Sequence, residues 1–262
     1  MKNSDKNVLE FWEHKGESKS PGRLVTHKDL HQVEMEIKTV LNFLHKNDTL
    51  LDVGCGNGFA TSIYAKNCLR TIGIDYSSTM VDSATRAYAN KRLSFMKANV
   101  LDLSKEIGTF SIILSTRCLI NLRNWNEQKK AIKKLHELLA PGGRLLLLEG
   151  MKQGRDNLNK LRKRTGLSAM PKVWHNIDFD EKKLFPFLKN YFTVKQDIRF
   201  GLYDVLTRVY YPAYIFPKDA RFRTKHHDTA VKMYYAFGER SCNEYSREAC
   251  LILIKKETPA VK

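Results

Sequence analysis

The chain has 262 residues, of which 42% are hydrophobic and 28% are charged. This balance is typical of a folded globular protein and argues against extended disorder. Lys and Arg total 45 against 28 Asp and Glu, which gives a formal net charge of +17. The surplus favours an anionic partner such as nucleic acid, a phosphorylated metabolite or a membrane surface, without choosing among them; a surface simply rich in lysine is an equal alternative.

The cysteines and the hydropathy indicate the compartment. Five cysteines form no CxxC pair and are odd in number, so they predict neither a zinc site nor a disulfide framework and indicate a reducing environment. No apolar run reaches the ~18 residues of a membrane helix, and the first residues are unlike a signal peptide. We therefore expect a cytoplasmic protein without a membrane span. No linker divides the chain, so we expect a single domain over residues 1–262.

Two helices are expected first, at residues 7–15 and about 28–46, because apolar residues recur there at helical spacing. The stretch 49–60 follows, where an apolar run ends in Asp52. Three glycines come next at every second position, Gly54, Gly56 and Gly58. This pattern predicts a strand, a tight turn and a helix, with the glycines letting a ligand lie against the backbone. The next strand, 70–75, ends in Asp75, which is well spaced to accept from a ribose hydroxyl pair. Together they predict a pocket for an adenosine-containing cofactor.

The details of the turn indicate which cofactor. A dinucleotide-binding turn needs glycine or alanine at its sixth position so that the helix can face a pyrophosphate, and Phe59 fills that position here. Asp52, directly before the turn, would repel phosphate and suits a ligand with an ammonium and a sulfonium group. Residues 51–58 resemble motif I of the class I S-adenosylmethionine-dependent methyltransferases. The resemblance implies S-adenosyl-L-methionine as the cofactor.

The resemblance also implies the fold, which is α/β with a Rossmann-like, doubly wound and mostly parallel seven-stranded sheet. Its parts would be an N-terminal helical cap (1–46), a cofactor-binding core (47–150), a substrate-covering insertion (151–246) and a last strand (247–256). The cofactor-binding residues would be Asp52, Gly54, Gly56, Gly58, Asp75, Tyr76, Asn99, Val100 and Ser115. Family members usually have an acid at the place of Asn99, where it accepts from the adenine amino group. Because asparagine keeps an acceptor oxygen, we expect that contact to survive without the charge.

In such a cap, Phe11 and Trp12 are candidates to close over the ligand, with simple packing as the alternative, and Arg23 is a weak candidate to bind the cofactor carboxylate.

The remaining helices are expected near 77–90, 125–139 and 180–190, and the remaining strands at 93–97, 110–114, 144–149, 192–199 and 249–256. The turn Pro141-Gly142-Gly143 before a leucine-rich strand is a further landmark of the family. Residues 157–176 resemble, loosely, a subgroup associated with bacterial surface-polysaccharide gene clusters.

Substrate-binding candidates follow from the sheet, because ligands of doubly wound sheets bind beyond the carboxyl ends of the strands. Arg117 and Asn121 come after the fourth strand and, one helical turn apart, are expected to share a face toward the substrate. An ion pair between Arg117 and a surface acid is an equal alternative. Further candidates are Glu149, Arg162, Tyr203 and Arg208. Of these residues, Arg117, Arg162 and Arg208 are candidates to hold an anionic group.

A hydroxyl acceptor must lose a proton on methylation, and histidine is the natural base near neutral pH. His175 is the first choice because it lies in the variable segment after the fifth strand. Packing beside Trp174 is the alternative role, and His226 and His227 are the next candidates for the base. No spacing of acids requires a metal.

The expected substrate is a small molecule, because the chain lacks the motifs of nucleic-acid amino, cytosine-C5 and protein arginine methyltransferases. We expect transfer of a methyl group to a hydroxyl of a sugar or a related polar metabolite. An RNA methyltransferase is the main alternative, since basic residues interleaved with tyrosines can hold single strands. A catalytically inactive, cofactor-binding partner subunit is the other alternative.

Overall fold

The computed structural model describes residues 3–17, 28–215, 224–238 and 240–256. Seven strands form one sheet in the order β3-β2-β1-β4-β5-β7-β6. They are β1 (Thr49–Val53), β2 (Arg70–Asp75), β3 (Leu93–Lys97), β4 (Phe110–Thr116), β5 (Leu139–Gly150), β6 (Phe192–Arg199) and β7 (Glu248–Lys255). The first five strands pair in parallel, and β7 runs antiparallel between β5 and β6. This confirms the predicted Rossmann-like, mostly parallel sheet.

The order of the strands also locates the site. From β1 the chain moves outward to β2 and β3, and it then returns to place β4 on the other side of β1. The carboxyl ends of β1 and β4 therefore flank the point where the winding direction reverses. Ligands of open α/β sheets bind in the crevice at such a point.

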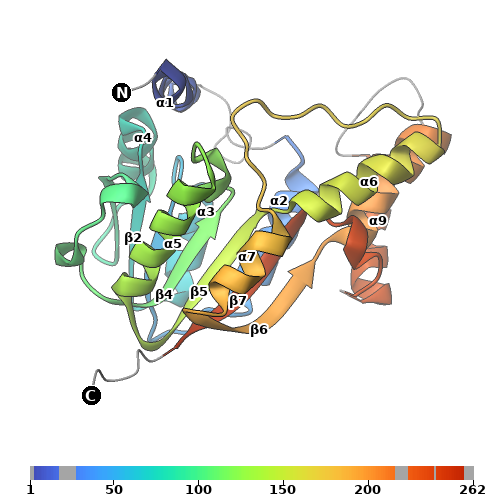
Figure 1. Cartoon of the computed structure of the whole chain (residues 1–262). Helices are drawn as coiled ribbons and strands as arrows, with labels where there is room; N and C mark the ends of the chain where they lie inside the picture. Colours follow the sequence, from blue (N-terminus) through green and yellow to red (C-terminus); the bar gives the residue numbers. More distant parts are fainter. Residues whose placement is uncertain (1–2, 18–27, 216–223, 239, 257–262) are drawn as a thin grey trace.

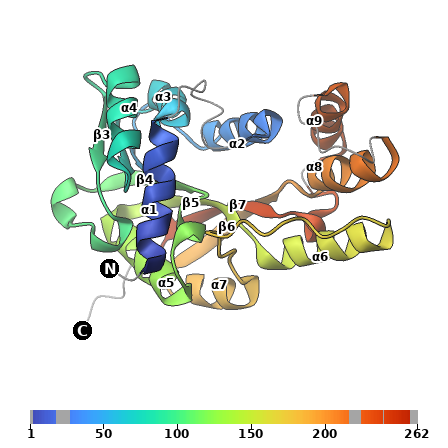
Figure 2. The same cartoon turned by 90° about the horizontal axis from the view of Figure 1, so that it is seen from above.

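Helices cover both faces of the sheet. They are α1 (Asn3–Gly16), α2 (Leu30–Leu41), α3 (Phe59–Tyr64), α4 (Ser78–Tyr88), α5 (Trp125–Leu138), α6 (Lys152–Arg164), α7 (Glu181–Leu188), α8 (Gly201–Val205) and α9 (Lys225–Phe237), with a π-helical segment, η6 (Leu206–Ile215), after α8. In Figure 2, α2, α3 and α4 lie on one side of the sheet and α5 and α7 on the other. Helix α1 crosses over the carboxyl ends of the strands (Figures 1 and 2).

The leucines of β5 show how the sequence builds the two layers. Leu145 and Leu147 belong to the hydrophobic cluster that includes residues of α5 and α7, whereas Leu146 and Leu148 belong to the cluster that includes residues of α2 and α3. All four are fully buried. Because side chains alternate between the faces of a strand, a continuous apolar run is the pattern of a strand covered on both faces.

Several boundaries differ from the predicted ones. Helix α2 ends at Leu41 and not near residue 46. Strand β5 starts at Leu139, so the predicted turn lies within the strand, where the pairing with β4 shifts register between Phe110 and Ile112. Gly142, at φ 66°, allows this irregularity. Arg23 lies outside the described residues. None of the helices in the described ranges combines the length and hydropathy needed to cross a bilayer.

Candidate cofactor site and active site

The glycine turn after β1 is fixed by the carboxylate at the end of β2. Asp75 Oδ2 accepts from Gly56 N at 2.8 Å, and Asp75 Oδ1 accepts from Ser77 N at 2.9 Å. Gly54 and Gly56 have φ of 75° and 53°, and a Cβ on Gly54 would stand 2.5 Å from the Cys118 side chain. Glycine is therefore required in this turn. Burial raises the pKa of Asp75, and the backbone N–H donors oppose that rise.

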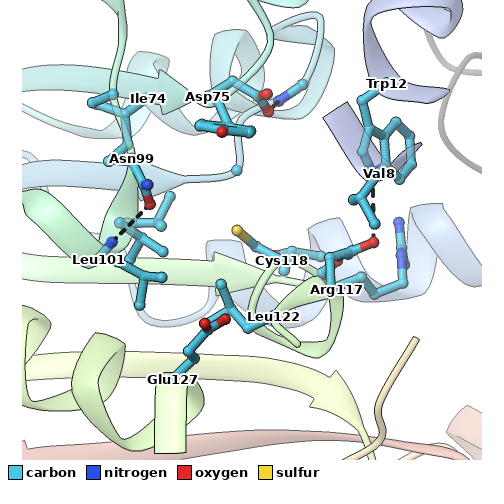
Figure 3. Close-up of a pocket in the computed structure, with 18 of the residues that line it drawn as sticks. Val8, Trp12, Ile74, Asp75, Asn99, Leu101, Arg117, Cys118, Leu122 and Glu127 are labelled. Carbon is cyan, nitrogen blue, oxygen red and sulfur yellow. Dashed lines mark hydrogen bonds between the residues drawn. The ribbon is translucent and has the colours of Figure 1, made fainter. Parts of the chain in front are cut away.

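A cavity of about 240 Å³ opens at the carboxyl ends of β1, β2 and β4 (Figure 3). Its lining includes six of the predicted cofactor residues, Gly54, Gly56, Asp75, Tyr76, Asn99 and Val100. Trp12 and Val8 of α1 stand on its far side from Asn99 (Figure 3). The pocket thus offers a carboxylate, a glycine backbone and apolar walls in one place, as an adenosine group requires.

Asn99 has a structural task of its own. Its Oδ1 accepts from Leu101 N at 3.0 Å (Figure 3) and so caps the short 3₁₀ turn Val100–Asp102. Its Nδ2 lies 3.2 Å from Asp102 Oδ2. The oxygen expected to meet the adenine amino group therefore already holds a backbone donor. A carbonyl oxygen has a second lone pair, so the side chain shapes the turn and still faces the cavity.

A second cavity, of about 80 Å³, adjoins the first between α2, the glycine turn and the end of β4. Four residues line both cavities, Gly54, Gly56, Thr116 and Arg117. Asp52 lines only the smaller one, and its Oδ2 accepts from Thr61 Oγ1 at 2.6 Å. Burial raises the pKa of Asp52 to about 6.

Arg117 stands on the wall between the two cavities, with a left-handed backbone at φ 49°. Such a conformation is uncommon for residues other than glycine, and it clusters at functional sites. The guanidinium donates to buried Glu36 and lies 3.9 Å from Glu248 Oε2. Arg117 therefore forms the ion pair that was the alternative to substrate binding, but its acidic partner, Glu36, is buried and not on the surface. The expected helical turn from Arg117 to Asn121 is wrong, because only Leu119–Asn121 is helical, as a 3₁₀ turn.

Asn121 and His175 are in contact beside the larger cavity. Asn121 lines the cavity and donates from Nδ2 to Arg117 O at 2.8 Å. Its Oδ1 faces His175 Nδ1 at 2.6 Å and accepts from Trp12 Nε1 at 3.4 Å. The His175 ring also contacts the rings of Phe11 and Trp174, and burial lowers its pKa. Both predicted cap aromatics, Phe11 and Trp12, therefore pack around this histidine.

Comparisons with known proteins agree with this geometry. A family described as "Methyltransferase domain" matches residues 50–143. The chain is 29% identical over 118 residues to the malonyl-[acyl-carrier protein] O-methyltransferase of Priestia megaterium. The aligned residues make up 44% of this chain and 41% of that protein. It is 28% identical over 138 residues to the ubiquinone biosynthesis O-methyltransferase of Coxiella burnetii. Here the aligned residues make up 52% of this chain and 55% of that protein. The chain spans about half the length of these curated relatives.

Solved structures share the fold over most of the chain. The putative methyltransferase in complex with the Haloferax volcanii Trm112 activator superposes with a TM-score of 0.60 at 15% identity, covering 96% of this chain and 97% of that one. The N-methyltransferase NodS of Bradyrhizobium japonicum, bound to S-adenosylhomocysteine, superposes with a TM-score of 0.58 at 16% identity. The superposition covers 96% of this chain and 100% of NodS. The resemblance of residues 51–58 to the class I S-adenosylmethionine-dependent methyltransferases is therefore confirmed: residues 50–143 match a methyltransferase domain, and the chain shares its fold with solved methyltransferases.

Two residues predicted for the cofactor site line neither cavity. Ser115 is fully buried, and its hydroxyl donates to Glu149 Oε1 at 2.6 Å, so Thr116 takes its place on the wall. Gly58 begins α3 at φ 76°, where a Cβ would stand 2.8 Å from Ala84 Cβ. Ser115 therefore has a buried structural partner, and Gly58 allows the backbone to turn into α3 beside Ala84.

The Glu149 carboxylate forms hydrogen bonds with the loop after β4 and is not exposed to a substrate. Its Oε1 accepts from the N–H groups of Cys118 and Leu119 at 3.1 and 2.9 Å, and its Oε2 accepts from Ile120 N at 3.3 Å. The side chain is fully buried, and burial raises its pKa to about 7 although these donors favour the carboxylate. This corrects the predicted substrate contact, because Glu149 shapes the loop that carries Arg117 and Asn121.

Three further predicted substrate residues lie away from both cavities. The buried Tyr203 hydroxyl donates to Asp29 Oδ1 at 2.9 Å, and Arg208 forms an ion pair with the same carboxylate. Arg162 donates to the carbonyls of Ser168, at 2.8 Å, and of Arg208. Of the three arginines predicted as candidates to hold an anionic group, Arg162 and Arg208 therefore have partners within the protein, and Arg117 is the one that lines the cavities.

The two other candidate histidines also have structural partners. His226 Nε2 lies 2.9 Å from Leu206 O, and His227 is buried with Nδ1 2.9 Å from Thr224 Oγ1. Neither residue lines either of the two cavities. Of the three candidate histidines, His175 is the one whose ring contacts a residue that lines the larger cavity, Asn121.

Glu13 attaches helix α1 to the start of α4, a contact that the sequence did not reveal. Its carboxylate accepts from the backbone of Ser78 at 2.9 Å and of Thr79 at 2.8 Å, at the start of α4, and from the Ser77 hydroxyl at 2.9 Å. Burial raises the pKa of Glu13, but the hydrogen bonds from Thr79 and Ser78 together outweigh it and lower the pKa to about 2. The same helix supplies Val8 and Trp12 to the cavity wall.

We expect Glu13→Gln to weaken S-adenosylhomocysteine binding by about two- to tenfold, because hydrogen bonds that keep α1 over the cavity are lost. Calorimetric titration measures the effect, and Glu10→Gln, at an exposed position of the same helix, is the matched control. Since the folded-state pKa lies below the ordinary 4.5, the contact persists above pH 4.5 and is lost as the pH falls toward 2. Equal affinities for the two variants would contradict a closing role for α1.

Proposed function

We propose that this methyltransferase transfers a methyl group from S-adenosylmethionine to a hydroxyl of a small polar acceptor, such as a sugar or a related metabolite. The observation that carries the proposal is the Asn121–His175 pair beside the cofactor cavity. Two matched relatives are named O-methyltransferases, which supports an oxygen atom as the acceptor. We keep the cytoplasm as the proposed compartment, on the cysteine pattern of the sequence.

The hydrogen bonds of Asn121 assign the proton on His175. Because Asn121 Nδ2 donates to Arg117 O, its Oδ1 is the atom that faces the imidazole. An amide oxygen only accepts, so in the neutral ring His175 Nδ1 carries the proton and Nε2 keeps its lone pair. The Asn176 side chain also hydrogen-bonds to this histidine and opposes the lowering of its pKa. Burial lowers the pKa of His175, which keeps the ring neutral at pH 7. A neutral imidazole with a free nitrogen is the form that a general base needs.

The proposed reaction is an in-line displacement. The acceptor oxygen attacks the methyl carbon, the bond from that carbon to the sulfonium sulfur breaks, and its electron pair stays on sulfur to give S-adenosylhomocysteine. The hydroxyl proton passes to His175 Nε2. Because the methyl group is already activated, most of the acceleration comes from alignment, which can supply about 7–11 kcal/mol.

An anionic group on the acceptor has less support. Arg117 pairs with Glu36, and Arg208 pairs with Asp29. Arg123 lines the cavity, but its Nε donates to Glu127 Oε1 at 2.6 Å. We therefore propose a polar acceptor and do not require that it be phosphorylated.

The experiment is transfer of labelled methyl from S-adenosylmethionine into a host cell extract, run untreated, nuclease-treated and protein-depleted. We expect label to persist in a small polar or glycan fraction after both treatments. Label lost with nuclease would favour RNA as the acceptor and overturn the proposal. No label, in spite of measurable cofactor binding, would favour an inactive partner subunit.

A further inference from the structure

The segment between α6 and α7 exposes several large apolar side chains close together. It runs from the far end of α6 back to the start of α7 (Figure 1). Within five positions of this segment, Val173 is 41% exposed, Trp174 59% and Ile177 38%. Exposed apolar side chains that are scattered singly are ordinary, whereas clustered ones mark sites of interaction or ligand binding. The cluster therefore indicates a surface that contacts another molecule.

Hydrogen bonds fix the backbone around this cluster. Asn176 N donates to Val173 O at 3.1 Å and closes a turn whose two central residues are Trp174 and His175. Ile177 N donates at 2.6 Å to a backbone carbonyl of the loop after β4, which ties the turn to the sheet. Because the turn is already ordered, a molecule that binds to it loses little affinity to the cost of ordering a loop.

The indole of Trp174 lies beside the proposed base, His175. The centroids of these two rings are 5.1 Å apart, and the Trp174 ring stands nearly perpendicular to those of His175 and Phe11, at 86° and 89°. His175 in turn contacts Asn121, which lines the larger cavity. Because Trp174 stays 59% exposed in spite of these contacts, much of its ring surface is open. A molecule on that surface would lie about one ring away from His175.

The surroundings of the open indole indicate the chemistry of its ligand. The indole face is apolar and carries partial negative charge, whereas His175 and Asn121 beside it are polar. A pyranose ring matches both features, because its C–H groups form a weakly positive, apolar face and its hydroxyls project from the rim. A flat aromatic acceptor has two apolar faces and favours a closed slot, whereas the Trp174 surface is open to water. The arrangement therefore favours a sugar ring over an aromatic one.

We propose that Trp174 forms a subsite for the acceptor, and that its indole stacks on the C–H face of a pyranose so that one hydroxyl of the sugar reaches His175 Nε2. This inference rests on the proposed function and narrows its acceptor to a sugar ring. Stacking orients the ring and so selects the hydroxyl that is methylated, while His175 takes the proton of that hydroxyl. Trp174 lies outside the matched residues 50–143, so the family match does not assign it this role.

The binding test is a saturation-transfer NMR titration of the full chain, with S-adenosylhomocysteine present, against the methyl pyranosides of glucose, galactose and mannose. We expect at least one of them to bind the wild type, with saturation strongest on the ring C–H protons of one face. Trp174→Ala should bind it about tenfold more weakly, and Trp174→Phe, which keeps an aromatic ring, should retain most of the affinity. Phe237→Ala, which removes an exposed ring of α9, is the control and should bind as the wild type does.

Two further probes distinguish a sugar ring from other ligands. Sorbitol carries the hydroxyls of a hexose on an open chain without a ring face, so its binding should not depend on Trp174. Phenol has an aromatic ring and one hydroxyl, and binding of phenol at Trp174 without binding of any pyranoside would overturn the proposal in favour of an aromatic acceptor. Absence of pyranoside binding by the wild type, or equal binding by the wild type and Trp174→Ala, would overturn it also.

Rates of labelled methyl transfer separate a subsite from packing that only supports His175. Dilution of the host cell extract varies the acceptor concentration, and Trp174→Ala should need about tenfold more extract for half its maximal rate while approaching the wild-type rate at saturation. A variant that is slow at every dilution and binds the pyranosides normally would overturn the proposal. If the wild type transfers no label, the proposed function itself fails, whereas an active wild type whose pyranoside binding ignores Trp174 refutes this inference alone.

Discussion

His175→Ala is expected to lower kcat by about 10²–10⁴-fold, the usual contribution of a general base, and to leave the affinity for S-adenosylmethionine nearly unchanged. The imidazole is held by Asn121 beside the cofactor cavity, so its loss removes the proposed proton acceptor and not the cofactor contacts. The measurement is the initial rate of methyl transfer at saturating cofactor. His45→Ala, at an exposed position, is the control.

The pH profile distinguishes a base from a packing residue. Because burial lowers the pKa of His175 from 6.5, the neutral, active ring persists to a lower pH than in a free histidine. The rate should therefore fall on the acid side, below pH 6.5, and that limb should disappear in His175→Ala. Asn121→Ala should also lower the rate, since it removes the acceptor that fixes the proton on Nδ1. A variant that retains the wild-type rate and profile would leave His175 with a packing role alone.

Asp75→Ala is expected to weaken cofactor binding by about 1.5–3 kcal/mol, or roughly 10- to 150-fold, the range for hydrogen bonds to a charged group. The carboxylate is held at the end of β2 by two backbone donors, and it lines the larger cavity. We propose that its remaining lone pairs accept from the ribose hydroxyls. Titration with S-adenosylhomocysteine measures the loss.

Asp75 also supports the glycine turn, so the test needs a control for folding. Asp75→Asn keeps one acceptor oxygen for the backbone donors and removes the charge, and it should lose affinity while its thermal unfolding stays closer to that of the wild type. Asp82→Ala, at an exposed position on α4, should change neither property. Undiminished affinity in both Asp75 variants would place the ribose elsewhere.

The sheet could be predicted because its signals are local. The alternation of Leu145 to Leu148 between two clusters follows from one apolar run, and the glycine turn follows from residues that are neighbours in sequence. The carboxylate of Asp75 could be predicted too, because its distance from the turn is set by one βαβ unit. These features depend on the periodicity of the chain and not on distant partners.

The contacts that complete the site could not be predicted, because each joins residues far apart in the chain. Glu36 meets Arg117 across 81 residues, and Glu13 meets Ser78 across 65. Glu149 was predicted to contact the substrate because it lies at the end of a strand. Its carboxylate instead accepts hydrogen bonds from three backbone N–H groups of the neighbouring loop. A charged residue in sequence does not reveal whether its partner is a ligand or the protein itself.

The most direct test of the central claim is calorimetric titration of the purified wild-type chain with S-adenosylmethionine. Binding of one equivalent per chain, lost or strongly weakened in Asp75→Ala, is the result that we predict from the cavity at the ends of β1, β2 and β4. Absence of binding by the folded wild type, or binding that Asp75→Ala leaves intact, would contradict the assignment of this cavity to the cofactor.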